Sequence, residues 1–319
     1  MLEVILNPLV LNIALFIASL VILFYSADLL IDGISSYAAK LGLSDEIIGF
    51  VVVALAASVP EMVTSIGGIT SGEPGLLFGT IIGANMVHMA LLVGGLTVVA
   101  KKMNMQSKLL RHSNWFVWML LMLPFILAAD GLLSRSDGLI LTAAFVVYLV
   151  RLWKKEEKSM KLKKTVRLER IWRDAVIFLG ALAVLTLAGQ FLVFSAINLS
   201  DIIQIPAYFI ALTVIAVSSA MPDFAVGLRS VFRGVQKIGL GEIIGSMVVE
   251  LLLFLGVISI IQPIPIEVPS VLSASIFLII SITITMYYLK LKSITWKHGI
   301  VLLSLYALFV LSELYQLFF

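Results

Sequence analysis

Two pairs of adjacent residues, Pro60–Glu61 and Pro222–Asp223, stand inside long apolar stretches of the chain. Proline removes a backbone donor and clashes with the preceding helical turn, so carbonyl oxygens just before it are left free. Within lipid, free carbonyls and a carboxylate are tolerated where they face a wet or ligand-filled cavity. Carbonyl, hydroxyl and carboxylate oxygens together suit hard cations such as Na⁺ and Ca²⁺. The two pairs therefore predict a cation site within a membrane.

The composition supports a membrane environment. Of 319 residues, 61% are hydrophobic and 13% are charged, and the mean hydropathy is +1.11. A soluble domain of this length needs more polar surface. Apolar stretches of about twenty residues recur along the chain, and each is long enough to cross a bilayer as a helix. The sequence contains no cysteine, which excludes disulfides and thiolate metal sites. These features predict an all-α polytopic membrane protein.

Hydropathy predicts ten transmembrane helices, at 8–30, 46–71, 75–99, 112–130, 135–153, 174–196, 205–228, 238–261, 268–289 and 296–317. If the N-terminus lies outside, 21 of the 22 Lys and Arg residues fall in inside connections, and Arg135 is the exception. Because basic loops stay in the cytoplasm, we expect both termini outside and the central loop inside. The short length without a regulatory domain leads us to expect a prokaryotic plasma membrane.

The chain contains an internal repeat. The segment GFVVVALAASVPEMVTSIGGI (49–69) aligns with ALTVIAVSSAMPDFAVGLRSV (211–231) at an offset of 162, and the two Pro-acid pairs coincide. At the same offset, and without a gap, GTIIGANMVH (79–88) falls on GEIIGSMVVE (241–250). A register kept through a loop for some forty residues indicates a duplication.

Each copy holds five predicted spans, so the second copy enters the membrane from the opposite side. The prediction is two inverted-topology five-helix repeats, as in secondary transporters whose substrate site lies near the midplane. The first repeat covers 1–153 with its motif at 49–95, a basic cytoplasmic linker covers 154–173, and the second repeat covers 174–319 with its motif at 211–257.

The helices that follow the Pro-acid segments contribute further candidates. Glycines spaced four apart permit close helix packing there, at Gly79 and Gly83 in the first copy and at Gly241 and Gly245 in the second. This packing places His88 and Glu250, which coincide in the repeat, within reach of the two acids.

At these residues the sequence resembles the cation/calcium exchanger superfamily, and most closely its Na⁺/Ca²⁺ exchanger branch. SVPEMVTSI with GTIIGANMVH, and SSAMPDFAVGL with GEIIGSMVVE, resemble that family's two alpha repeats. The resemblance implies exchange of Ca²⁺ against Na⁺, or H⁺ in some branches, by alternating access. It also implies that the first and sixth spans act as gates. The family's ion ligands map onto Glu61, Asp223, Glu250, His88, Ser58, Ser219, Ser246, and the carbonyls of Ala54 and Ala216.

This chain departs from the family pattern at several ligand positions. Ala57, Ala84 and Ala220 lack the side-chain oxygen that the family usually supplies. His88 is the largest change, because imidazole is a poor ligand for Na⁺ or Ca²⁺ and titrates near neutral pH. Two readings therefore stay open: Ca²⁺ export in exchange for Na⁺, or an H⁺-coupled or other divalent-metal (Mg²⁺, Mn²⁺, transition metal) exchanger in which His88 alters selectivity.

An enzyme is not expected, because the chain contains neither HExxH nor GxSxG and its acids occur as repeat-related pairs. We expect no cofactor and no nucleic-acid partner. The expected partners are inorganic cations and the lipid bilayer, and the expected state is a monomer.

Overall fold

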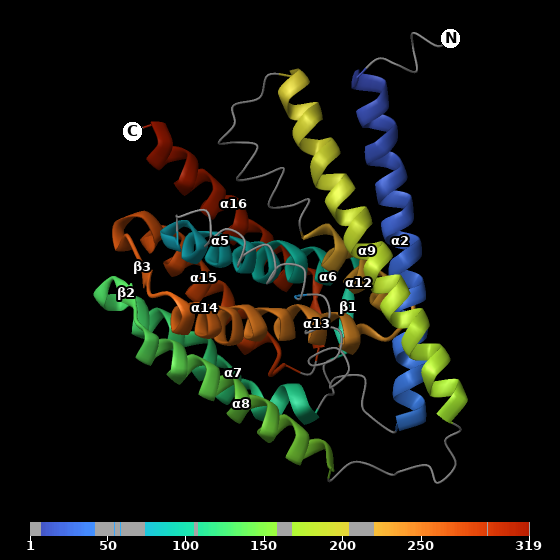
Figure 1. Ribbon diagram of the computed structural model, residues 1–319, viewed down its shortest axis with the longest axis horizontal. Helices are drawn as coiled ribbons and strands as arrows, with labels where there is room; N and C mark the ends of the chain where they lie inside the picture. Colours follow the sequence, from blue (N-terminus) through green and yellow to red (C-terminus); the bar gives the residue numbers. More distant parts are fainter. Residues whose placement is uncertain are drawn as a thin grey trace.

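The computed structural model describes residues 8–41, 54, 58, 74–104, 108–157, 168–203, 220–291 and 293–318 (Figure 1). The first half of the chain contains α2 (Pro8–Leu41), α5 (Pro74–Met86), η2 (Val87–Leu92), α6 (Val93–Val99), β1 (Lys102–Asn104), α7 (Lys108–Leu127), η3 (Ala128–Asp130), β2 (Leu132–Leu133) and α8 (Arg135–Glu157). The second half contains α9 (Leu168–Ile203), α12 (Met221–Phe232), α13 (Gln236–Val248), η5 (Val249–Phe254), α14 (Leu255–Ile261), β3 (Ile264–Pro265), α15 (Val268–Tyr288), β4 (Ser293–Thr295) and α16 (Trp296–Phe318).

The offset of 162 found in the sequence also relates these elements. It carries α5, η2 and α6 onto α13, η5 and α14 with no difference at any boundary. It carries α2, α7 and α8 onto α9, α15 and α16 to within two residues at each end. The duplication therefore relates all the described α- and π-helices except α12, whose counterpart lies outside the described residues, and the predicted repeat is confirmed.

The two copies run in opposite directions. The Asn198 side-chain amide of α9 donates to the Asn12 carbonyl of α2 at 3.1 Å, so the end of one helix meets the beginning of the other. Further along, a Cβ at Gly33 would lie 3.4 Å from the Phe178 nitrogen, which places late α2 beside early α9. Figure 1 shows the same antiparallel relation between the helix formed by α5 and α6 and the helix formed by α13 and α14. The inverted-repeat architecture is confirmed.

Two short antiparallel ladders join the copies. In one, β1 pairs with β4, and Lys102 lies opposite Thr295. In the other, β2 pairs with β3, and Leu133 lies opposite Ile264. The offset of 162 converts the first pairing into the second, because Lys102 corresponds to Ile264 and Leu133 to Thr295. The ladders thus obey the same internal two-fold relation as the helices.

Two hydrophobic cores hold the described helices. The larger core lies around α5, α6, α13 and α14 and includes Ile82, Leu96, Met247 and Leu255, all at most 1% exposed. Helices α7, α8, α15 and α16 pack around these central helices. The smaller core lies between α2 and α9 and takes in parts of α12 and α13. Outward-facing side chains such as Val21, Leu139 and Leu311 are apolar and exposed, as expected for a lipid-facing surface.

Six described helical segments are long and apolar enough to cross a bilayer, namely Pro8–Gly33, Ile81–Val99, Arg135–Lys154, Gln236–Ile261, Val271–Tyr288 and Trp296–Tyr315. Shorter apolar helices occur at Trp115–Asp130 and Val176–Leu192. The span predicted at 46–71 lies outside the described residues apart from Ala54 and Ser58, so the count of ten stays a prediction.

The span predicted at 205–228 is described from Ala220 onward, and its helix extends past the predicted end. Helix α12 begins at Met221, next to the proline, and continues to Phe232. It ends where Gly234 adopts a positive φ of 73° and the Val235 N–H donates to the Ser230 carbonyl. Glycine is favoured at such a helix end because it has no Cβ to clash in this conformation.

Candidate cation-binding site

The site is built on two π-helical segments, η2 and η5, in the middle of the two central helices. His88 is the second residue of η2, and Glu250 is the second residue of η5. The Val93 N–H donates to the His88 carbonyl, and the Leu255 N–H donates to the Glu250 carbonyl, each over five residues. Single π-turns of this kind are frequent at functional sites because they displace side chains from the regular helical face.

The third element is the N-terminal turn of α12. Pro222 occupies one of the first two positions of this helix, and Asp223 lies in its first turn. Proline fits a helix start because backbone N–H groups in the first turn have no partner within the helix, so the N–H that proline lacks is not needed there. A carboxylate is favoured at the same place by the helix dipole. The Asp223 side chain is nevertheless buried, with the residue 7% exposed. The Pro-acid pair therefore delivers a carboxylate to the interior at the point where a helix begins.

His88 and Asp223 are in direct contact. The His88 Nε2 atom lies 2.8 Å from Asp223 Oδ2 and donates to it, which assigns the proton to Nε2. Both residues are almost fully buried, so water competes little with this contact. Glu250, on η5, is also buried, with the residue 3% exposed. Of the residues predicted from the sequence, Asp223 and His88 are thus in direct contact, and Glu250 is buried on η5.

Asn85 is a site residue that the sequence analysis did not single out. Its side-chain amide donates to Glu250 Oε2 at 2.8 Å and to the Ile81 carbonyl at 2.7 Å. The residue is fully buried, and it lies one helical turn before His88. Its repeat counterpart is Met247, which has no hydrogen-bonding amide, so a comparison of the two copies hides it. An amide within a mid-membrane apolar segment was the signal that could have found it.

Ser246 lies on α13, one turn from Glu250, and is 1% exposed. Its hydroxyl donates to Glu242 Oε1 at 3.3 Å rather than to Glu250. Glu242 is itself fully buried. This face of α13 and η5 therefore carries oxygen-bearing side chains at intervals of four residues, at positions 242, 246 and 250.

The remaining predicted ligands are only partly described. Ala54 is fully buried, and Ser58 is 1% exposed, with no hydrogen bond from its hydroxyl to the described residues. Glu61, Ala216 and Ser219 lie outside the described residues, so their place in the site stays a prediction. Within the described residues, no group of three His, Cys, Asp or Glu side chains is arranged to hold a metal ion. The described candidate ligands therefore lie on η2, α12, α13 and η5, together with Ala54 and Ser58.

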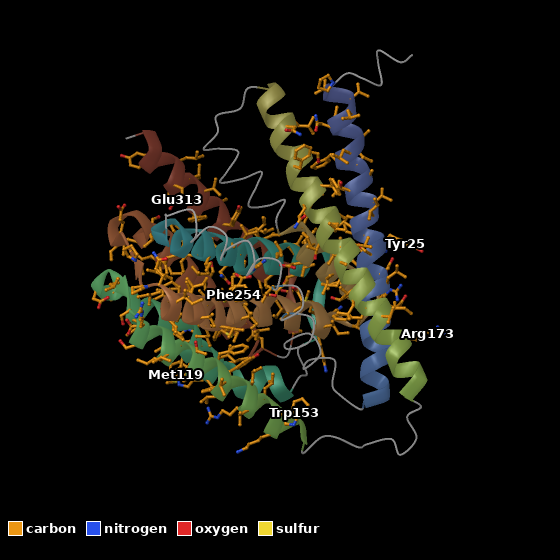
Figure 2. The ribbon with its side chains drawn as sticks, in the orientation of Figure 1. Tyr25, Met119, Trp153, Arg173, Phe254 and Glu313 are labelled. Carbon is orange, nitrogen blue, oxygen red and sulfur yellow. The ribbon has the colours of Figure 1, made fainter. Side chains whose placement is uncertain are left out.

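Helix α9 approaches the Pro-acid pair closely. A Cβ at Gly189 would lie 2.7 Å from the Pro222 ring, a separation that real Cβ atoms essentially never show. Only glycine allows α9 to contact α12 here without a shift of one of them. Side chains of the surrounding helices are drawn in Figure 2, in which Phe254 marks the end of η5 and Tyr25 marks α2. One of the two long helices thus lies directly against the start of the site helix.

Inverted copies of a helical bundle that meet at buried carboxylates, with interrupted helices at the meeting point, define a secondary transporter of the membrane. The model of the sodium/calcium exchanger protein family matches residues 11–154 and 174–315. The chain belongs to this family. It is therefore a cation antiporter of the cation/calcium exchanger type, and membership in a family of transporters agrees with the expectation that it is not an enzyme.

Several curated proteins and solved structures are similar to the chain. The putative antiporter CaxA of Alkalimonas amylolytica is 29% identical over 255 residues, which cover 77% of this chain and 80% of CaxA. The inner membrane protein YrbG of Escherichia coli is 29% identical over 260 residues, covering 78% and 80%. A structure of the sodium-calcium exchanger NCX_Mj superposes with a TM-score of 0.84 at 23% identity, covering 95% of this chain and 99% of that one. The superposition on NCX_Mj supports the overall fold described above.

Proposed function

We propose that the protein exports Ca²⁺ in exchange for Na⁺ by alternating access across a prokaryotic plasma membrane. The observation that carries this proposal is the buried cluster in which Asp223 and Glu250 meet the polar side chains of η2 and α5. Two carboxylates from one repeat, with expected oxygens from Glu61, Ser58 and Ser219, form a ligand set suited to hard cations. A relative from Methanosarcina acetivorans, which is 22% identical over 95% of this chain, is named a sodium/calcium exchanger, and this supports the choice of ions.

In this proposal, a bound cation takes the place of the hydrogen-bond donors that contact the carboxylates of Asp223 and Glu250. His88 donates to one oxygen of Asp223, and Asn85 donates to one oxygen of Glu250. An ion that binds both carboxylates must replace or supplement these contacts. Because Ca²⁺ and Na⁺ would compete for the same oxygens, occupancy by one excludes the other, and the two fluxes are coupled.

The ligand set that we propose for Ca²⁺ and Na⁺ joins the described residues Asp223, Glu250 and Ser246 to Glu61, Ser58, Ser219 and the carbonyls of Ala54 and Ala216. His88 is a donor to Asp223 in this set, and it becomes a ligand only in the transition-metal candidate below. Support for the second group comes from the register of the repeat. We also propose a monomer with both termini outside and the central loop in the cytoplasm, and the support for this orientation is the distribution of Lys and Arg.

A second candidate function follows from the contact between His88 and Asp223. Imidazole is a preferred ligand of transition metals and a poor ligand of Ca²⁺ and Na⁺. A site with His88 directly on a ligand carboxylate therefore favours an exchanger of Mn²⁺ or another transition metal, or one coupled to H⁺. This candidate differs from the first in the ions and keeps the same site.

Purified protein in proteoliposomes tests both functions. Vesicles loaded with Ca²⁺ are diluted into buffer that supplies a Na⁺ gradient alone or a pH gradient alone, and Ca²⁺ release is followed. The first proposal expects release driven by the Na⁺ gradient, absent in vesicles with Asp223→Asn protein. Release driven only by the pH gradient, or competition by Mn²⁺ at concentrations well below those of Ca²⁺, supports the second candidate and contradicts the first.

A further inference from the structure

Helices α2 and α9 form a unit apart from the main bundle. They pack along each other over most of their length, and Figure 1 shows them side by side at the edge of the molecule. Their core contains Leu23, Ala27, Leu185 and Leu192, and it is separate from the core around α5 and α13. Within the described residues, this pair packs on the rest of the protein mainly through α12. Contacts between α2 and α12 therefore decide how the pair sits against the bundle.

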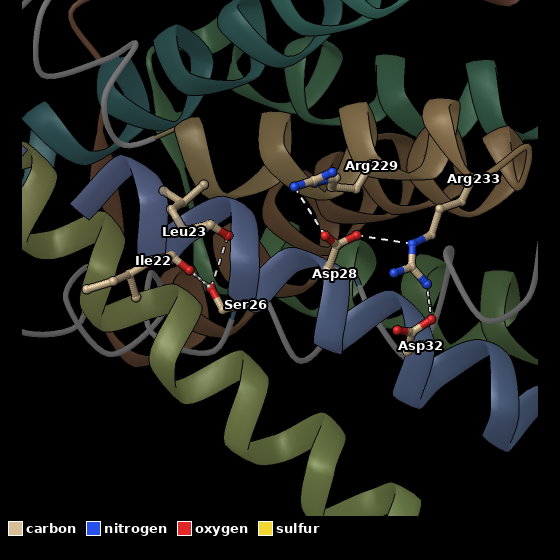
Figure 3. Close-up of polar contacts among 7 residues, drawn as sticks. All are labelled: Ile22, Leu23, Ser26, Asp28, Asp32, Arg229 and Arg233. Carbon is tan, nitrogen blue, oxygen red and sulfur yellow. Dashed lines mark hydrogen bonds and ion pairs between the residues drawn. The ribbon is translucent and has the colours of Figure 1, made fainter. Parts of the chain in front are cut away.

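Those contacts include a cluster of ion pairs, drawn in Figure 3. Arg229 Nη2 lies 3.1 Å from Asp28 Oδ2, and Arg233 Nε lies 3.1 Å from Asp28 Oδ1. Arg233 also pairs with Asp32 through its Nη1 atom. The Arg229 guanidinium further lies 6.0 Å from the centre of the Phe24 ring. We call Asp28, Asp32, Arg229 and Arg233 the α2–α12 ionic cluster.

The α2–α12 ionic cluster and the cation site share one helix. Asp223 lies in the first turn of α12, Arg229 lies in its last turn, and Arg233 is its C-cap residue. A helix of 12 residues is stiff, so a displacement of α2 that pulls on Arg229 also displaces Asp223. The side chain of Asp28 is 23% exposed, and it accepts from both arginines, which makes it the centre of the cluster.

The α2–α12 ionic cluster joins the first copy to the second, and it has no repeat-related equivalent. The offset of 162 relates Asp28 and Asp32 to Gln190 and Phe194 of α9, and it relates Arg229 and Arg233 to Gly67 and Ser71. None of these four counterparts carries a charge. In an inverted repeat, the two access states are approximately related by exchanging the conformations of the two copies. A contact between the copies that lacks a repeat-related counterpart therefore stabilises one access state and not the other.

We infer that Arg229 and Arg233 are positioning residues for the exchange cycle, which hold α2 against α12 in one access state and so set the balance between the two states. The inference rests on the proposed antiport function. It assigns the asymmetry of the transporter to four charged residues outside the cation site. The arginines act on Asp223 through α12, and they contact no transported ion.

The test compares Asp28→Asn, Arg229→Gln and the double variant in vesicles of known orientation. Loss of the cluster lowers the population of the state that it holds, so the apparent Ca²⁺ affinity must fall on one face and rise on the other. We expect a shift of about two- to fivefold on each face, because the ion pairs are partly exposed. The double variant should shift by less than the product of the single effects, because both changes remove one shared contact. Arg173→Gln on α9, outside the cluster, is the matched control and should shift neither face.

Affinities that stay unchanged on both faces, or that change in the same direction, overturn the inference. The variant with Arg229→Lys and Arg233→Lys keeps the charges and should retain the ratio of the two affinities. If it shifts as far as Arg229→Gln, charge pairing is not the cause and the inference fails.

A second measurement separates this inference from the proposed function. The chain has no cysteine, so Tyr25→Cys on α2 and Met119→Cys on α7 carry spin labels at defined and exposed places (Figure 2). Arg229→Gln should increase a second population of label distances relative to the labelled parent. If the label distances change but the protein shows no Na⁺-driven Ca²⁺ flux, the inference is supported and the proposed function is contradicted. If the protein shows that flux but Arg229→Gln leaves the label distances unchanged, the function is supported and the inference is contradicted.

Discussion

His88 and Glu250 occupy the same place in two inverted copies, yet they contact different partners: His88 donates to Asp223, and Glu250 accepts from Asn85. Each is the second residue of a π-helical segment, and the offset of 162 relates the two segments without a difference at either end. The backbone of the site is therefore symmetric, whereas its side-chain contacts are not. Four predictions follow from these contacts and from the helices that hold them.

The first prediction concerns the contact between His88 and Asp223. His88→Asn removes the 2.8 Å contact and frees Oδ2 of Asp223 for a cation. Hydrogen bonds to charged groups contribute about 1.5–3 kcal/mol, so the apparent affinity for Ca²⁺ should rise by roughly tenfold. The measurement is the Ca²⁺ concentration at half-maximal flux in proteoliposomes. His298→Asn, which removes an imidazole bonded to Thr295 at the start of α16, should leave this value unchanged. If His88→Asn leaves the Ca²⁺ concentration at half-maximal flux unchanged, His88 is a structural residue.

The second prediction concerns the carboxylate of Asp223. Asp223→Asn keeps the size of the side chain but removes the charge that a Ca²⁺ ion needs, and it changes the partner of His88. Loss of one member of a buried charged contact costs about 2–5 kcal/mol, so exchange should fall roughly 30-fold or more. Flux is measured at saturating ions together with the amount of folded protein. Asp137→Asn, at the start of α8, removes the charge from a carboxylate that accepts from Ser134 and should retain normal flux. Normal exchange in Asp223→Asn would exclude this residue as a ligand.

The third prediction concerns Asn85, which the repeat comparison hides. Asn85→Leu removes the donor to Glu250 Oε2 within a buried environment, and we expect a loss of roughly tenfold in flux. The repeat-related substitution Met247→Leu serves as the control, because it conserves volume in a fully buried position. Equal effects of the two substitutions on flux would show that packing, and not the amide, matters at position 85.

The fourth prediction concerns the approach of α9 to Pro222. Gly189→Ala places a Cβ 2.7 Å from the proline ring, so α9 or α12 must shift. We expect the unfolding free energy to fall by about 1–3 kcal/mol and the flux to fall with it. Gly180→Ala on the same helix meets nothing within 4 Å and should be neutral or stabilising by up to about 1 kcal/mol. Thermal unfolding in detergent compares the two variants, and equal midpoints would contradict the prediction.

Much of the fold could be predicted from the sequence because the repeat register is strong. The offset of 162 was visible in two motifs, and it describes the helices and both ladders. Span ends were less accurate: α2 was predicted to end near residue 30 and continues to Leu41, and α9 begins at Leu168 instead of near 174. Hydropathy marks only the part of a helix within lipid, and these helices extend past it.

The site was predicted as a set of residues but not as a set of contacts. His88 contacts Asp223 and Glu250 is buried beside Asn85, whereas Ser246 donates to Glu242 and Asn85 was missed. The π-helical segments could not be predicted, because a change from four- to five-residue hydrogen bonding leaves hydropathy unaltered. Contacts between residues that are not repeat-related, such as His88 with Asp223, depend on how the two copies pack.

The two β-ladders have a consequence for the identity of the folding unit. Each ladder takes one strand from either copy, so a half-chain expressed alone has β1 without β4 and β2 without β3. Its strands then present open edges, and its central helix lacks the antiparallel neighbour that covers it. The repeat therefore records a duplication, and we expect the two copies to depend on each other for folding.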